Sequence, residues 1–170
     1  MLLLQQEAEK SKDELLKEKS ELEFQLFRMQ ENVKEIAKRF SVLGIDQTKD
    51  ENWVIVYASE NNDTCKIMLH DCTSPFLGNW DFSIHAQYTD HHTIQIDDIR
   101  GEENKGYGSV CMDYLKQHAT NQNVHAIKGN IVKRDWDHID RLVHFYEKHY
   151  FKVKLSKHEK HGKIYWTPAM

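Results

Sequence analysis

The sequence has little cysteine and no long apolar run, which argues against a disulfide-stabilised protein and against a membrane-spanning one. Three cysteines occur among 170 residues, widely spaced and without a Cys-x-x-Cys pair. Reduced thiols in a cytoplasmic protein fit this usage better than a disulfide framework does. No run approaches the ~20 apolar residues that a spanning helix needs. We therefore expect a soluble, cytoplasmic protein with no membrane association.

The chain also lacks an excess of basic charge and any close pairing of metal ligands. It carries 23 Lys and Arg against 27 Asp and Glu, a net charge of −4, so no basic footprint favours nucleic acid. Eleven histidines invite a metal hypothesis. Cys65, His70 and Cys72 lie near one another, and His91 and His92 follow. No pair has the spacing of a closed zinc site, so the sequence predicts neither nucleic-acid binding nor a metal.

The first 45 residues predict a long helical arm. They contain no proline, and Gly44 is their first glycine. Two interpretations remain open for the arm: a self-associating, coiled-coil-like homodimer element, or a first helix whose C-terminal half packs on its own domain. Its apolar residues recur every seven positions in two registers, which are Ala8, Leu15, Leu22, Met29, Ile36 and Leu43, and Leu26, Val33 and Phe40.

From Trp53 onward the pattern becomes that of a compact α+β domain, which we place at residues 51–170. Short β-type runs and alternating segments predict a meander of four strands, followed by helix, strand, helix and two closing strands. Asn61–Asp63 reads as a hairpin turn. The predicted strands cover residues 53–57, 65–69, 80–88, 93–99, 124–132, 151–155 and 163–166, with one helix following the turn at 105–109 and another beginning near Asp137.

Three of the seven glycines lie between residues 101 and 108, where a strand ends and a helix begins. Glycine lets backbone approach a ligand closely, and free N–H groups at a helix start suit a phosphate. Lys105 adds a positive charge and Ser109 a hydroxyl. The segment is neither a P-loop nor a dinucleotide fingerprint. On its own chemistry it is either a diphosphate cradle or an ordinary glycine-eased helix start.

Two motifs carry a family resemblance. Glu103-Asn104-Lys105-Gly106-Tyr107-Gly108-Ser109, followed by an amphipathic helix, resembles the acetyl-CoA pyrophosphate loop of the GNAT N-acetyltransferase superfamily. Phe145-Tyr146-Glu147-Lys148-His149-Tyr150-Phe151 is similar to its second signature. The resemblance covers roughly residues 53–167. It implies a mixed, mainly antiparallel sheet of six to seven strands flanked by helices, and transfer of an acetyl group from acetyl-CoA to an amine acceptor.

The resemblance also implies roles for particular residues. Backbone groups near Ile99 and Arg100 would bind the pantetheine arm, and Tyr146 would be the general acid that protonates the thiolate. Asp97 and Asp98 are candidate bases, although adjacent strand residues point to opposite faces. Tyr146 also falls on an apolar helix face, so a core tyrosine is the alternative. The implied diphosphate ligands are Lys105, Gly106, Tyr107, Gly108 and Ser109.

Three positions depart from the family pattern. Glu103 stands where Gln or Arg is usual, Ile139 where Asn is customary, and Tyr150 where glycine precedes the closing phenylalanine. Because Glu103 undermines side-chain contacts to a diphosphate, we expect backbone N–H groups to make them. The departures leave a second function open, a non-catalytic coiled-coil assembly or regulatory module with a degenerate acyl-CoA-binding domain.

Overall fold

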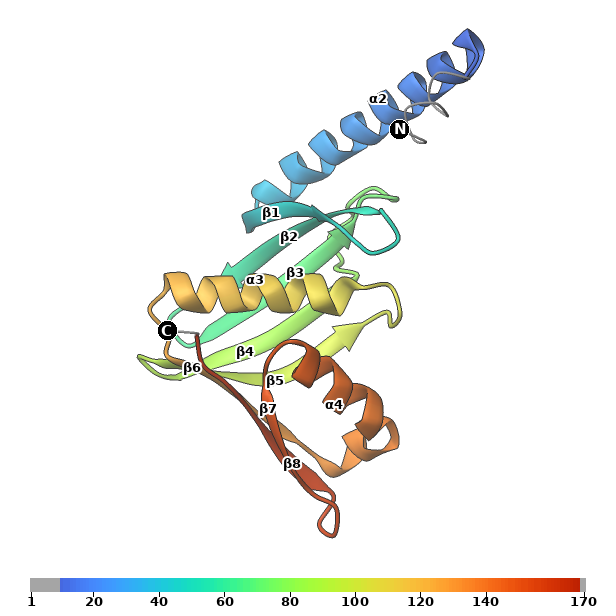
Figure 1. Ribbon diagram of the computed structural model, residues 1–170. Helices are drawn as coiled ribbons and strands as arrows, with labels where there is room; N and C mark the ends of the chain where they lie inside the picture. Colours follow the sequence, from blue (N-terminus) through green and yellow to red (C-terminus); the bar gives the residue numbers. More distant parts are fainter. Residues whose placement is uncertain (1–9, 169–170) are drawn as a thin grey trace.

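The computed structural model describes residues 10–168, which form one mixed sheet with helices on both faces (Figure 1). The helices are α2 (Lys12–Ala37), α3 (Tyr107–Asn121) and α4 (Ile139–Lys148), the last preceded by the 3₁₀ turn η1 (Lys133–His138). The strands are β1 (Ser41–Gln47), β2 (Trp53–Glu60), β3 (Thr64–Asp71), β4 (Phe82–Asp90), β5 (Thr93–Gly101), β6 (Ala126–Ile131), β7 (Lys152–Ser156) and β8 (His161–Trp166).

The sheet has eight strands in the order β1-β2-β3-β4-β5-β6-β8-β7. All neighbouring pairs are antiparallel except β5 and β6, which are parallel. The predicted class, a mixed and mainly antiparallel sheet flanked by helices, is confirmed. The predicted count of six to seven strands is one too low, because β1 was assigned to the helical arm.

The helical arm is shorter than the sequence indicated. Ser11 and Glu14 form a capping box that begins α2, and the helix ends at Ala37 rather than near residue 45. Val42 packs on one face of the sheet and Leu43 on the other, as neighbouring residues of a strand do. Leu43 thus matches the seven-residue spacing without being helical. Ala8 lies outside the described residues.

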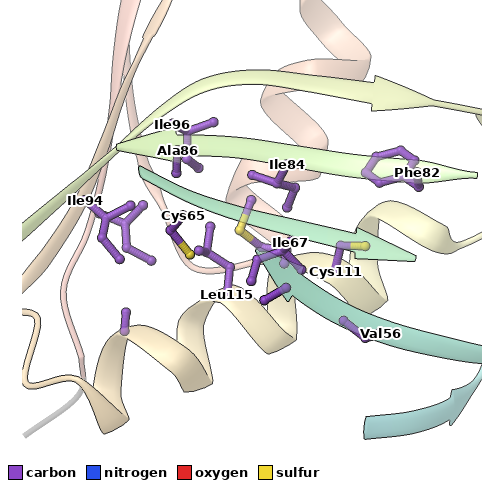
Figure 2. Close-up of a cluster of buried hydrophobic side chains, with 14 of the residues drawn as sticks. Val56, Cys65, Ile67, Phe82, Ile84, Ala86, Ile94, Ile96, Cys111 and Leu115 are labelled. Atoms are coloured by element: carbon purple, nitrogen blue, oxygen red, sulfur yellow. The ribbon is translucent and has the colours of Figure 1, made fainter. Parts of the chain in front are cut away.

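Each face of the sheet carries its own core. On one face, α3 contributes Cys111, Met112 and Leu115 to a cluster with strands β2 to β6 (Figure 2). On the other face, the C-terminal part of α2 packs through Val33 and Ile36. The N-terminal part of α2 projects beyond the sheet (Figure 1). Within residues 10–168, no helix combines the length and apolar character that crossing a membrane would require.

The parallel pair β5 and β6 separates at one end. The two strands pair only from Thr93 to Ile96 and from Ala126 to Gly129. Beyond this, β5 continues to Gly101 without β6 beside it, and α3 begins six residues later. The register with β4 shifts between Ile96 and Asp98, so Asp97 is a β-bulge. This end of the sheet is therefore open next to the start of α3.

Candidate functional site

The glycine turn starts α3 with its first backbone N–H groups available. Gly106 is the N-cap residue, with a φ of 80°, and no side chain caps the helix. The N–H groups of Tyr107, Gly108 and Ser109 have no intrahelical partner at this position. A Cβ on Gly106 would also meet Lys49 Cγ at 3.3 Å. Both the left-handed backbone and the close approach of Lys49 explain why glycine stands here.

Two side chains of the turn form hydrogen bonds with other parts of the protein. Tyr107 is 4% exposed, and its hydroxyl donates to Asp71 at 2.5 Å. Burial, followed by its bond to Asp71, raises the pKa of Tyr107. The Ser109 hydroxyl accepts from Lys148 at 3.0 Å and lies 3.2 Å from His149 Nε2. The turn is thus anchored by its side chains, and its backbone is what remains to hold an anion.

A cavity of about 480 Å³ lies in front of this backbone, between the turn and α4. Gly106, Tyr107, Gly108 and Ser109 all line it, whereas Lys105 does not. Its remaining lining includes the basic side chains of Lys49, Arg141 and Lys148, the acidic Glu102, Glu103 and Asp135, and the histidines His138 and His144.

Arg141 forms an ion pair with Glu103. Its guanidinium donates to one Glu103 oxygen at 2.7 Å and lies 2.6 Å from the other, the two-point geometry that suits a carboxylate. Arg141 and Lys148 both come from α4. Lys148 belongs to the second signature, whereas Arg141 was not singled out from the sequence, because no local motif marks it. Its i, i+7 spacing from Lys148 on one helix face is the signal that could have found it.

A second cavity, of about 240 Å³, occupies the opening between β5 and β6. Asp97, Asp98, Ile99 and Tyr146 all line it, so the structure brings the predicted acid and both candidate bases together. Ile99 lines the larger cavity as well. The two cavities therefore meet along the end of β5. Arg100 is exposed and lines neither.

The two candidate bases have different partners. The Asp97 carboxylate accepts one hydrogen bond from Gln87 Nε2 at 3.1 Å. The Asp98 carboxylate accepts from Arg100 Nε at 2.5 Å. Since Asp97 is the bulged residue, its side chain is not fixed to the alternation of the strand. The Asp97 carboxylate therefore has the greater capacity to accept a further hydrogen bond.

Tyr146 is both a core residue and a cavity residue. It is 6% exposed, and its ring packs on Phe145 and Phe151. Burial, followed by the charges of Asp135 and Asp98, raises the pKa of its hydroxyl. The phenol is consequently protonated at neutral pH. Its burial fits the core tyrosine, and its place in the lining of the smaller cavity leaves the general-acid role open as a prediction.

Two departures from the family pattern differ in how well they suit the structure. Tyr150 follows α4 with a φ of 67°, the left-handed region that favours glycine. Ile139 begins α4 and packs against the core of the sheet face that α3 covers. An apolar side chain is therefore suited to that position.

Comparison with known proteins places the chain. No family model matches it. It is 49% identical over 159 residues to the uncharacterized protein YocC of Bacillus subtilis (strain 168), covering 94% of this chain and 96% of that protein. The structure of the GNAT domain of S. lividans PAT matches 78% of this chain and 98% of its own, at 5% identity and a TM-score of 0.57.

A cAMP-binding acyltransferase from Mycobacterium smegmatis, in its E234A mutant form, matches 81% of this chain at 9% identity and a TM-score of 0.58. The match spans 51% of that longer protein. At such low sequence identities these structures establish similarity of fold alone. They confirm the fold that the two sequence motifs implied. The chain belongs to the family of YocC, and its fold is that of the GNAT acetyltransferases.

Proposed function

We propose that the protein is an N-acetyltransferase that moves the acetyl group of acetyl-CoA directly to a primary amine. The observation that carries the proposal is the opening between β5 and β6, which joins the free helix start at Gly106 to a cavity lined by Tyr146. An extended thioester cofactor needs both a diphosphate site and a narrow channel that leads to the reacting carbonyl.

The cofactor would lie along the end of β5. The N–H groups of the turn from Lys105 to Ser109 would hold its diphosphate. Arg141 and Lys148 would add positive charge from α4. Past Ile96 the backbone of β5 has no β6 partner, so groups near Ile99 and Arg100 can bond the pantetheine amides as an added strand would.

The chemistry needs a base and an acid on opposite sides of the thioester carbonyl. Asp97 or Asp98 would take a proton from the ammonium, freeing the amine to attack. The new C–N bond forms as the C–S bond breaks, and Tyr146 gives its proton to the departing thiolate. Their hydrogen bonds favour Asp97 as the base, because the Asp98 carboxylate already accepts from the charged Arg100 side chain.

Binding and turnover together test this function. Calorimetric titration with acetyl-CoA should give one site per chain, and a thiol-release assay over a panel of amines should identify an acceptor. Tyr146→Phe should lower kcat by about 100-fold or more while changing the Kd for acetyl-CoA less than about twofold. Tyr165→Phe, which alters an exposed tyrosine of β8, is the matched control. Unchanged kcat in Tyr146→Phe would show that its hydroxyl is structural.

A second candidate is a non-catalytic acyl-CoA-binding or regulatory module. The observation that favours it is the Glu103 carboxylate at the cavity that would take the diphosphate. Under this alternative acetyl-CoA binds, yet no amine of the panel releases thiol above the solvent rate.

The three cysteines are free thiols, which supports the cytoplasmic location that we propose for either function.

We also propose that α2 pairs with α2 of a second copy as a short coiled coil. Its apolar stripe is continuous along the helix, and its C-terminal part, which includes Val33 and Ile36, is covered by the sheet. The N-terminal part of the same stripe is at least half exposed at Leu15, Leu22 and Leu26. A second copy would cover these side chains with the same kind of surface.

Charge substitutions on the stripe test the pairing. Wild-type protein should show the mass of a dimer by light scattering, and Leu22→Glu/Leu26→Glu should show that of a monomer. Phe24→Glu is the control, because Phe24 is 57% exposed but lies about 200° around the helix from Leu22. A monomeric wild type at about 50 μM, roughly tenfold above a weak micromolar Kd, contradicts the proposal, as does a dimer that survives the double substitution.

A further inference from the structure

Four chemically active side chains meet at the other end of α3, away from the glycine turn. Glu60 ends β2, and Cys65, the second residue of β3, is directly opposite it across this hairpin. Tyr88 comes from β4 and His118 from α3. The proposed acetyl transfer uses none of them.

The contacts within this cluster bring three kinds of ligand atom together. His118 Nε2 lies 2.9 Å from Glu60 Oε1. A carboxylate oxygen of Glu60, Cys65 Sγ and a ring nitrogen of His118 all lie within 4.8 Å of one another. The Tyr88 hydroxyl donates to the same Glu60 oxygen and lies 3.3 Å from His118 Nε2.

We propose that Glu60, Cys65 and His118 bind a zinc ion. Thiolate, imidazole and carboxylate are the ligands that Zn²⁺ takes in proteins, at about 2.3 Å for sulfur and about 2.0–2.2 Å for nitrogen and oxygen. Tetrahedral angles at those bond lengths separate the ligand atoms by about 3.3–3.6 Å. The Glu60 and His118 atoms, 2.9 Å apart, already lie near this separation, and no pair among the three ligand atoms is more than 4.8 Å apart.

The surroundings suit a zinc ion held by three protein ligands, an arrangement that leaves the fourth tetrahedral position open. One thiolate and one carboxylate cancel the charge of Zn²⁺, which matters because Cys65 is fully buried (Figure 2). The Tyr88 hydroxyl donates a hydrogen bond to the Glu60 carboxylate, as outer partners of metal ligands commonly do. Bound in this way, the ion would tie the β2–β3 hairpin to α3.

Burial, followed by the charge of Glu60, raises the pKa of the Cys65 thiol to about 12. Zinc binding forms a Zn–S bond and releases the thiol proton to solvent.

Cobalt titration of the full-length protein, stripped with a chelator, tests the site. One equivalent of Co²⁺ should produce a thiolate-to-cobalt charge-transfer band and the visible bands of four-coordinate cobalt, and Zn²⁺ should displace both. Cys65→Ser should lose the charge-transfer band. Cys111→Ser, a substitution of another fully buried cysteine, should keep it. Absence of the band in the wild type, or its persistence in Cys65→Ser, overturns the proposal.

Two further variants guard against a folding defect in Cys65→Ser. Tyr88→Phe should weaken Zn²⁺ binding by about 10–100-fold and keep the charge-transfer band at saturating metal. His118→Gln should abolish binding at the same concentration. Equal zinc affinity in wild type, Tyr88→Phe and His118→Gln would assign the metal to surface histidines and overturn the site. None of these measurements uses acetyl-CoA, so their outcome is separate from that of the proposed transferase function.

Discussion

The two ends of helix α3 offer different kinds of binding chemistry. At its start the polar groups are backbone N–H groups of consecutive residues, arranged by Gly106. Near its other end His118 meets side chains from three strands, among them Glu60 and Cys65. The helix has 15 residues and is about 22 Å long at 1.5 Å per residue. The two sites share a helix without sharing a ligand atom.

This difference determines which substitutions should impair binding at each end of α3. A backbone site depends on main-chain geometry, so its side chains can be engaged elsewhere, as Tyr107 is with Asp71. A side-chain cluster depends on the relative positions of several elements and on the identity of each residue. Substitutions that affect the backbone should therefore impair the first end alone, and substitutions in the shared core should reach both.

The largest expected effect comes from the core between the two ends. Leu115 is fully buried on α3 against the sheet. Leu115→Ala should lower the free energy of unfolding by about 3 kcal/mol, through lost burial and the cavity left behind. Urea unfolding measures this change. Leu77→Ala, at a side chain that is 85% exposed, is the control and should stay within about 0.5 kcal/mol of wild type. Similar losses in the two variants would contradict the shared core.

Gly106→Val should separate the two ends. A β-branched residue at a φ of 80° is strained, and its side chain would collide with Lys49. We expect the Kd for acetyl-CoA to rise about 100-fold, which corresponds to about 2.7 kcal/mol. Cobalt binding at the other end should be retained. The measurement is a pair of titrations, one with acetyl-CoA and one with Co²⁺.

Gly78→Val is the matched control for this separation. Gly78 also has a positive φ, of 101°, but no atom lies within 4 Å of a Cβ placed there. It carries the strain of the left-handed region but lines neither of the two cavities. If Gly78→Val weakened acetyl-CoA binding as much as Gly106→Val does, general destabilisation of the protein would explain the loss of affinity, and the glycine turn would not.

The same difference explains what could be predicted from the sequence. The glycine turn is contiguous, so its chemistry and its place after a strand were readable in order. Glu60, Cys65 and His118 are brought together by the β2–β3 hairpin and by α3, and no spacing rule for metal ligands covers such a combination. Arg141 was missed for the same reason, since its partner Glu103 is 38 residues away.

The misread start of the sheet has another cause. Leu43 continues the seven-residue spacing of the arm, yet it lies in β1 and packs on the face that α3 covers. A single apolar residue fits a helical repeat and a strand alternation equally well, so only the pairing of β1 with β2 decides. The hairpin turn at Asn61–Asp63 was predicted correctly, because turn residues act through local backbone preferences.

A smaller effect should come from the charge balance at the glycine-turn end. Arg141→Met leaves the Glu103 carboxylate without its partner beside the proposed diphosphate site. The Kd for acetyl-CoA should rise about tenfold, or 1.4 kcal/mol, and the loss should shrink in high salt. Glu103→Gln should bind slightly more tightly than wild type.

The double variant Arg141→Met/Glu103→Gln gives the sharper measurement. If Arg141 acts by neutralising Glu103, the double variant should recover most of the lost affinity, and the two substitutions will be non-additive. If Arg141 instead contacts the diphosphate directly, removal of Glu103 recovers little. Titrations of the four proteins with acetyl-CoA at one salt concentration separate these cases.

The smallest effect concerns a position that touches α3 between its two ends. Tyr150 adopts a φ of 67°, and its exposed ring lies 5.4 Å from Lys116 Nζ of α3. A non-glycine residue in this region costs about 1–2 kcal/mol, whereas an exposed cation–π contact returns about 0.5–1 kcal/mol. Tyr150→Gly should therefore stabilise the protein by about 0.5–1 kcal/mol without changing binding at either end of α3. Lys160→Gly, at another left-handed residue (φ 52°), should gain more stability in urea unfolding, because Lys160 makes no cation–π contact with any ring in the described part of the chain. A loss of stability in Tyr150→Gly would mean that the tyrosine ring, and not the backbone, determines this junction.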